Sequence, residues 1–134
     1  YEAVIVGAGS KLAEEWPEGI IEAPIAKDVF RPNRRVVASG GQRAVTHFQV
    51  LKEGQSFSLL SLWLETGRTH QIRVHLAYSG YPVVGDKMYG RADKSLGRQA
   101  LHAAALEFIH PLTGEKLKLT AKRPEDFQHL IDNI

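Results

Sequence analysis

The pattern of hydrophobic and polar positions predicts β-strands through the first half of the chain. Residues 1–7 alternate enough to form a strand. Residues 20–27 could form a shorter strand, and Pro24 inside it favours the edge of a sheet. Residues 44–52 and 57–65 alternate and are rich in β-branched and aromatic side chains. Because a short, glycine-containing connection joins these last two segments, they are predicted to form a β-hairpin.

Beyond residue 67 the hydrophobic period changes from two to about 3.6, which predicts a helix. The helix is expected over residues 69–77, with Thr69 as its N-cap. Gly80 follows where a left-handed residue commonly ends a helix. Ile72 and Leu76 lie four residues apart, so both side chains are expected to face the core.

The remaining pattern predicts a second hairpin and a final short helix. Residues 101–110 suit either a helix or a strand, but a Pro–Gly turn leads from them directly into the strictly alternating residues 116–121. Pro124 is expected at the first position of the last helix, followed by two acidic residues. The elements add up to an α+β fold, a mixed and predominantly antiparallel β-sheet with one or two helices.

Composition fits one folded domain or a piece of one. The chain has 134 residues, of which 43% are hydrophobic and 24% charged, as in ordinary globular proteins. No apolar run approaches the ~18 residues that span a membrane. The absence of cysteine excludes disulfides, thiol nucleophiles and cysteine-ligated metal sites, and it fits the cytoplasm as the expected location. The chain begins at Tyr1 with a strand already under way, which suggests a fragment of a longer protein.

Positive charge gathers in the second half of the chain. Residues 66–102 hold six Lys and Arg against two Asp, a net charge of +4. A basic patch of this kind suits a polyanion, because each neutralised phosphate releases counterions. An ordinary solvated basic surface would show the same pattern, and charge alone favours that interpretation.

The segment from Leu64 to Gly90 carries the most specific pattern. It reads LETGRTHQIRVHLAYSGYPVVGDKMYG and concentrates Gly, Arg and His where a strand leads into a helix. A helix N-terminus offers free N–H groups, and arginine adds a permanently charged fork of donors. Such a junction can hold a carboxylate or a phosphate, although a capped helix with solvent-exposed arginines is an equally simple explanation.

The same segment closely resembles the long G-R-T-H-Q-I-R-V-H-L-A…G-x-P-[IV]-x-G-D…Y-G signature of RluA-type pseudouridine synthases. Residues 1–7 resemble the family's Y-x-A-x-V-x-G strand, and residues 44–50 its A-x-T-x-[FY]-x-V strand. Residues 101–111 resemble its L-H-A…L-x-F-x-H-P segment. Residues 121–127 resemble its closing segment, with a lysine in place of the usual proline. The resemblance spans nearly the whole chain in the family's order.

This resemblance implies part of a pseudouridine synthase catalytic fold. The family isomerises uridine to pseudouridine in ribosomal or transfer RNA, without a cofactor or a metal. Its nucleophile is an aspartate in an H-R-L-D motif that precedes the tyrosine-bearing strand, and the chain contains no such motif. Residues 1–134 are therefore expected to be the C-terminal portion of a single catalytic domain, whose upstream half is a missing partner. The chain alone is expected to be inactive.

The resemblance also implies roles for individual residues. Tyr1 matches the tyrosine that stacks on the target base and is proposed to help remove a proton. Arg73 matches the arginine that pairs with the catalytic aspartate, and Leu101 matches, less closely, an apolar residue that packs against the base. Arg68 and His70 belong to the signature and are assigned to turn structure or RNA phosphate. Asp86 is expected to make local hydrogen bonds.

Two further basic residues are predicted to contact RNA. Lys87 and Arg91 lie in the positively charged stretch, and their assignment rests on that charge.

Other functional classes are less well supported. His70 and His75 are five residues apart and lack the i, i+4 spacing of a zinc-binding helix. Residues 7–10 are expected to form a turn; no third glycine follows and no nucleotide-binding helix is expected to begin there. The serious alternative is a non-catalytic RNA-binding fragment, which the basic stretch would serve equally well. A structural, oligomer-forming protein is a third possibility, with no sequence feature to support it.

Overall fold

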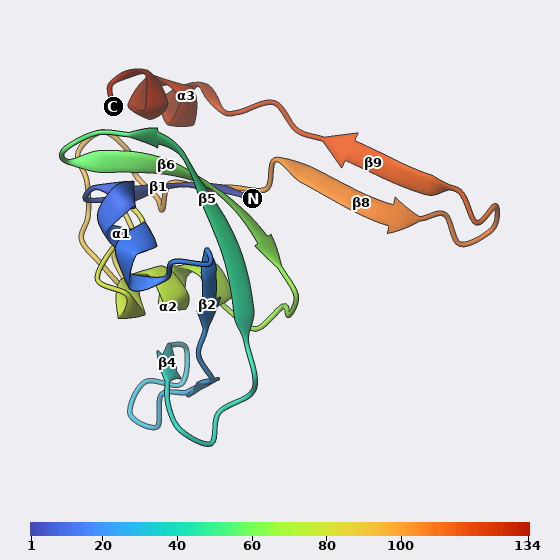
Figure 1. The fold of residues 1–134 in the computed structure, drawn as a ribbon, viewed down its shortest axis with the longest axis horizontal. Helices are drawn as coiled ribbons and strands as arrows, with labels where there is room; N and C mark the ends of the chain where they lie inside the picture. The colour runs from blue at the N-terminus through green and yellow to red at the C-terminus, as the bar shows by residue number, and fades with distance from the viewer.

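A five-stranded antiparallel sheet forms the centre of the computed structural model, which describes residues 1–134 (Figure 1). The strand order is β2-β5-β6-β1-β7, and each neighbouring pair is antiparallel. Its strands are β1 (Glu2–Val6), β2 (Ile20–Glu22), β5 (Val45–Glu53), β6 (Phe57–Leu64) and β7 (Leu101–His102). β1 therefore lies in the interior of the sheet, beside β6 and β7.

Three helices cover the two faces of this sheet. They are α1 (Gly9–Glu15), α2 (Gln71–Tyr78) and α3 (Glu125–Asp132). Helices α1 and α2 lie on one side of the sheet and α3 on the other (Figure 1). The three consecutive β1 residues Ala3, Val4 and Ile5 are accordingly all buried, although neighbouring side chains of a strand point to opposite faces. None of the helices has the length and apolar character needed to cross a membrane.

Two separate hairpins extend from this body. One consists of β3 (Ile25–Lys27) and β4 (Arg35–Val37), and the other of β8 (Ala105–Ile109) and β9 (Lys116–Thr120). The β8–β9 hairpin stands away from the sheet, and every residue of β8 is exposed (Figure 1).

The predicted fold class is confirmed, with three helices rather than one or two and with antiparallel pairing throughout. Both predicted hairpins form, but the segment predicted over residues 101–110 is divided: Leu101 and His102 join the main sheet as β7, and only Ala105–Ile109 pair with β9. Ile72 and Leu76 are buried in the main core, and Gly80 has the left-handed φ of 90° expected beyond the end of α2. The last helix begins one residue later than predicted, because Pro124 is its N-cap.

The turn predicted over residues 7–10 is wrong in its second half, because α1 begins at Gly9. The Gly9 N–H donates to the Ser58 hydroxyl of β6 at 2.8 Å. A Cβ on Gly9 would lie only 2.8 Å from a methyl group of Val50. The helix start is therefore fixed by close packing on the sheet, which local sequence does not report.

Two further predictions need correction. The single strand predicted over residues 20–27 is divided into β2 and β3, and the break falls at Ala23 and Pro24. Pro24 has no N–H to continue a ladder, so β3 pairs with β4 outside the main sheet. Thr69 is not the N-cap of α2; His70 occupies that position.

A buried polar network joins α2 to β5. The Gln71 amide nitrogen donates to the Thr46 hydroxyl at 3.0 Å, and this hydroxyl contacts His75 Nδ1 at 2.8 Å. His75 Nε2 lies 2.9 Å from the Ala23 carbonyl, which can only accept, so Nε2 carries the hydrogen. The Thr46 hydroxyl has a proton to donate, so we assign Nδ1 as its acceptor, which makes the ring neutral. Burial accordingly lowers the pKa of His75, although the Ala23 hydrogen bond opposes that shift.

We expect this network to make the fold sensitive to acid. Because the pKa of His75 is lower in the folded than in the unfolded chain, stability is complete above the ordinary histidine pKa of ~6.5 and falls as pH drops below it. The loss should grow as pH falls, since a protonated Nδ1 can no longer accept from the Thr46 hydroxyl. Urea unfolding across this pH range measures it. The decline should be shallower in His75→Gln; an equally steep decline in that variant would contradict the assignment.

Candidate active site

A shallow pocket of about 260 Å³ lies where β1 and α2 begin. It is lined by Tyr1, Leu64, Arg68, His70, Gln71, Ile72, Arg73, Gln99 and Leu101. Five of the seven residues that the sequence singles out therefore share one pocket, although they come from three separate parts of the chain. Their chemical roles stay predictions.

Tyr1 and Leu101 supply the flat and apolar walls of the pocket. The Leu62 N–H donates to the Tyr1 carbonyl at 2.8 Å, which attaches Tyr1 to β6. Leu101 pairs with Ala3 across β1 and β7, so it lies on the neighbouring strand of the same sheet. Tyr1 is 44% exposed, which leaves its ring accessible to a planar ligand.

Arg73 is held by a bidentate ion pair with Asp86. Its Nε and Nη2 donate to the two carboxylate oxygens at 2.8 and 2.9 Å. The Asp86 side chain is 1% exposed and that of Arg73 13%, so water hardly screens the pair. Nη1 of Arg73 makes no hydrogen bond within the chain, which leaves its two N–H groups free for a second anion.

Asp86 also organises the turn that follows it. Its Oδ1 accepts from the backbone N–H groups of Met88 and Tyr89 at 3.1 and 3.2 Å. Burial alone would raise the pKa of Asp86, but Arg73 and these N–H groups together lower it. The hydrogen bonds that Arg73 donates to Asp86 in turn raise the pKa of Arg73. Both groups are therefore charged at neutral pH. The local hydrogen bonds expected of Asp86 are present, and its bond to Arg73 is an addition.

Tyr89 joins Arg73 to His70. The Arg73 guanidinium lies 5.1 Å from the centre of the Tyr89 ring, a cation–π distance. The Tyr89 hydroxyl accepts from the Arg35 N–H at 2.9 Å and contacts His70 Nδ1 at 2.8 Å. Because this hydroxyl has its own proton to donate, we assign the His70 hydrogen to Nε2. Nε2 is then a free donor.

His70 is also the one non-glycine residue with positive φ, at 56°. This left-handed conformation is uncommon for a residue with a Cβ and marks a constrained position. Desolvation and, next, the charge of Arg73 lower the pKa of His70. The ring is accordingly neutral at physiological pH, as the proton assignment requires.

Lys87 and Arg91 lie outside this pocket. Both are exposed on the segment that connects α2 to β7. Neither side chain lines the pocket, and their predicted contact with RNA stays a prediction.

Sequence reasoning gave no role to Tyr89 or Gln99. Tyr89 belongs to the Y-G end of the signature, but nothing in the sequence pairs it with His70. Gln99 lies outside any motif and reaches the pocket only because it precedes β7. No group of three or more His, Asp or Glu side chains is arranged to hold a metal ion.

Comparisons with known proteins converge on one family. Residues 1–78 match the RNA pseudouridylate synthase family. The chain is 44% identical to the uncharacterized RNA pseudouridine synthase YjbO of Bacillus subtilis, over 98% of this chain and 44% of that protein. It is 40% identical to ribosomal large subunit pseudouridine synthase D of Zymomonas mobilis, over 97% of this chain and 43% of that protein. The chain thus spans less than half the length of these curated relatives.

Two solved structures with a similar fold carry the same family description. Human RNA pseudouridylate synthase domain containing 1 superposes with a TM-score of 0.70 at 28% identity, covering 92% of this chain and 53% of that one. Human RNA pseudouridylate synthase domain containing 4 gives a TM-score of 0.67 at 27% identity, covering 98% and 59%.

Proposed function

Because the chain belongs to the RNA pseudouridylate synthase family and is of the RluA type, we propose that it supplies the C-terminal half of the catalytic domain of an enzyme that isomerises uridine in RNA. The observation that carries the proposal is the pocket that gathers Tyr1, Arg73 and Leu101. An aromatic ring, a cation with free N–H groups and an apolar wall are what a flipped uracil and an ionised nucleophile require.

The proposed reaction exchanges one glycosidic bond for another. The N1–C1′ bond of uridine breaks and a C5–C1′ bond forms, while the proton of C5 leaves and N1 gains one. The upstream half supplies the aspartate nucleophile, and the free Nη1 of Arg73 favours its ionised form. Tyr1 stacks on the detached base and helps to remove the C5 proton, and Leu101 packs against the base.

We propose ribosomal or transfer RNA as the substrate and the cytoplasm as the location. Ribosomal RNA is the first candidate, because several relatives are named ribosomal large subunit pseudouridine synthase D. The missing upstream half is the other proposed partner, since the chain contains no H-R-L-D motif.

Product analysis tests the proposal. A longer chain that includes the upstream half should form pseudouridine in RNA, detected by mass spectrometry of nucleosides, whereas residues 1–134 alone should form none. Pseudouridine made by the pure 134-residue chain would contradict the assignment of the nucleophile to the upstream half. A longer chain that binds RNA without forming product would favour the non-catalytic alternative and overturn the proposal.

A further inference from the structure

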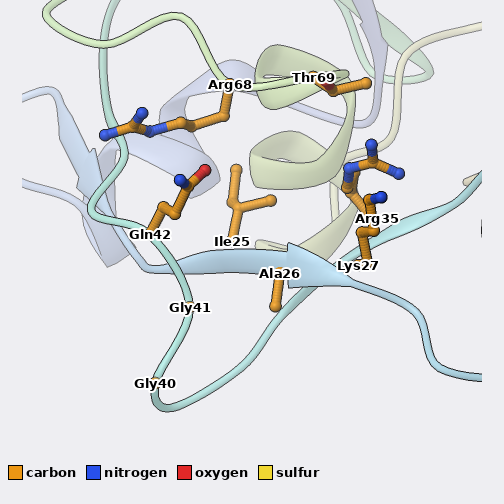
Figure 2. A pocket seen from close by; sticks show the side chains of 9 residues that line it. All are labelled: Ile25, Ala26, Lys27, Arg35, Gly40, Gly41, Gln42, Arg68 and Thr69. Atoms are coloured by element: carbon orange, nitrogen blue, oxygen red, sulfur yellow. The ribbon is translucent and has the colours of Figure 1, made fainter.

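A second pocket, of about 350 Å³, lies beside the candidate active site (Figure 2). It is bounded by the β3–β4 hairpin, the loop before β5 and the residues that precede α2. Arg68 and Gln42 lie on one side of it, Lys27 and Arg35 on the other, and Ile25 between them (Figure 2). The walls therefore combine three cations with amide and backbone groups, and they contain no acidic residue.

The three cations of this second pocket have no carboxylate partner. Lys27, Arg35 and Arg68 take part in none of the ion pairs of the structure, whereas Arg73 and Arg123 pair with acidic side chains. Arg35 and Arg68 are instead held by carbonyl groups: Arg35 Nη1 donates to Pro32 at 3.0 Å, and Arg68 Nε donates to Arg43 at 2.8 Å. Cations that border one concave site, with no carboxylate to compensate them, attract an anion.

The second pocket is physically joined to the candidate active site. Arg68 lines both pockets. Of the next two residues, Thr69 lines the second pocket and His70 lines the candidate active site. A polymer that places a base against Tyr1 would therefore continue past Arg68 into the basic pocket. RNA presents a charged phosphodiester on either side of each nucleotide.

We propose that this pocket binds a backbone phosphate of the RNA strand, next to the nucleotide whose base enters the active site. Lys27 and Arg35 neutralise the phosphate, Gln42 and Thr69 can donate hydrogen bonds to its oxygens, and Arg68 fixes the distance between the two pockets. The inference rests on the proposed function for its ligand, and it adds a β3–β4 surface outside the basic stretch 66–102.

Salt dependence of RNA binding tests the proposal. The probe is a fluorescein-labelled single-stranded oligouridine, titrated with the 134-residue chain at several KCl concentrations. Losing one phosphate contact should make the slope of log K against log salt shallower by about 0.7. Because Lys27 and Arg35 neutralise the same phosphate, Lys27→Gln/Arg35→Gln should reduce the slope by about 0.7, and Lys27→Gln alone by a part of that. Lys27 is exposed and makes no side-chain hydrogen bond, so this single variant does not depend on a change in folding.

Two controls separate position from charge. Lys116→Gln/Lys118→Gln removes the same charge from β9 and should keep the slope of the parent chain. Arg35→Lys keeps the positive charge in the pocket and should also keep the slope of the parent chain.

An unchanged slope in Lys27→Gln and in the double variant would overturn the inference. An equally reduced slope in the β9 control would overturn it too. Inorganic phosphate that perturbs the Gln42 and Thr69 amide signals in NMR spectra, where RNA does not, would overturn it in favour of a free anion. Because none of these readouts requires turnover, they fail independently of the proposed isomerase activity.

Discussion

Replacing Arg73 by alanine in the catalytically complete protein should reduce pseudouridine formation by about 10³-fold or more. The guanidinium is fixed by two hydrogen bonds to Asp86, and Nη1 remains free. A preorganised donor of this kind, in a partly buried site, contributes about 10²–10³-fold even when it carries no charge. Loss of the charge should also raise the pKa of the aspartate nucleophile, because a nearby cation favours the ionised carboxylate.

The lysine variant distinguishes charge from geometry. Arg73→Lys keeps a cation but cannot pair with Asp86 through two parallel N–H groups while presenting a third nitrogen. We expect only a trace of turnover. The measurement is kcat for both variants as a function of pH, where the alanine variant should need a higher pH for its residual activity. Near-normal turnover in both variants would refute the assigned role of Arg73.

The strands that the sequence predicts well are those whose pattern is local. Phe57 to Leu64 alternate strongly, and their hairpin partner is close in the chain, so β5 and β6 are found at nearly their observed bounds. Helix α1 is missed because it begins at a glycine and depends on contacts with Ser58 and Val50. Strand β4 is also missed, since three residues are too few to show a period and their partner β3 was assigned to one longer strand.

In the candidate site, too, the sequence identifies some residues, and only the structure shows the contacts between others. Tyr1, Arg73 and Leu101 follow from resemblance to a family signature, and no rule of composition or spacing would place them in one pocket. The pairing of Arg73 with Asp86 depends on the path of the segment that follows α2. The hydrophobic pattern of the sequence does not predict this path. The second basic pocket also depends on the tertiary fold, because Lys27 and Arg68 lie far apart in sequence and line one pocket only when the β3–β4 hairpin packs beside α2.

Asp86→Asn should destabilise the fold by roughly 3 kcal/mol, because it leaves the charge of Arg73 without a partner in a largely buried position. The amide oxygen can still accept from the N–H groups of Met88 and Tyr89, so the turn itself can persist. The variant should also lower kcat, since Asp86 is a positioning residue that holds Arg73. Urea unfolding of the 134-residue chain near neutral pH measures the first effect, and Asp93→Asn, on the same connecting segment, is a control expected to change little.

The pH dependence of the stability difference between Asp86→Asn and the parent chain identifies the cause of the destabilisation. The pKa of Asp86 is lower in the folded than in the unfolded chain. The contribution of the Asp86 carboxylate to folding stability is therefore complete above the ordinary aspartate pKa of ~3.9, and it is lost as pH falls through the pKa of the folded chain. The asparagine variant has no such titration. The stability gap between the two proteins should therefore be widest near neutral pH and close as the solution becomes acidic. A gap that stays constant through the acidic range would show that lost packing, and not the Arg73–Asp86 charge pair, causes the destabilisation.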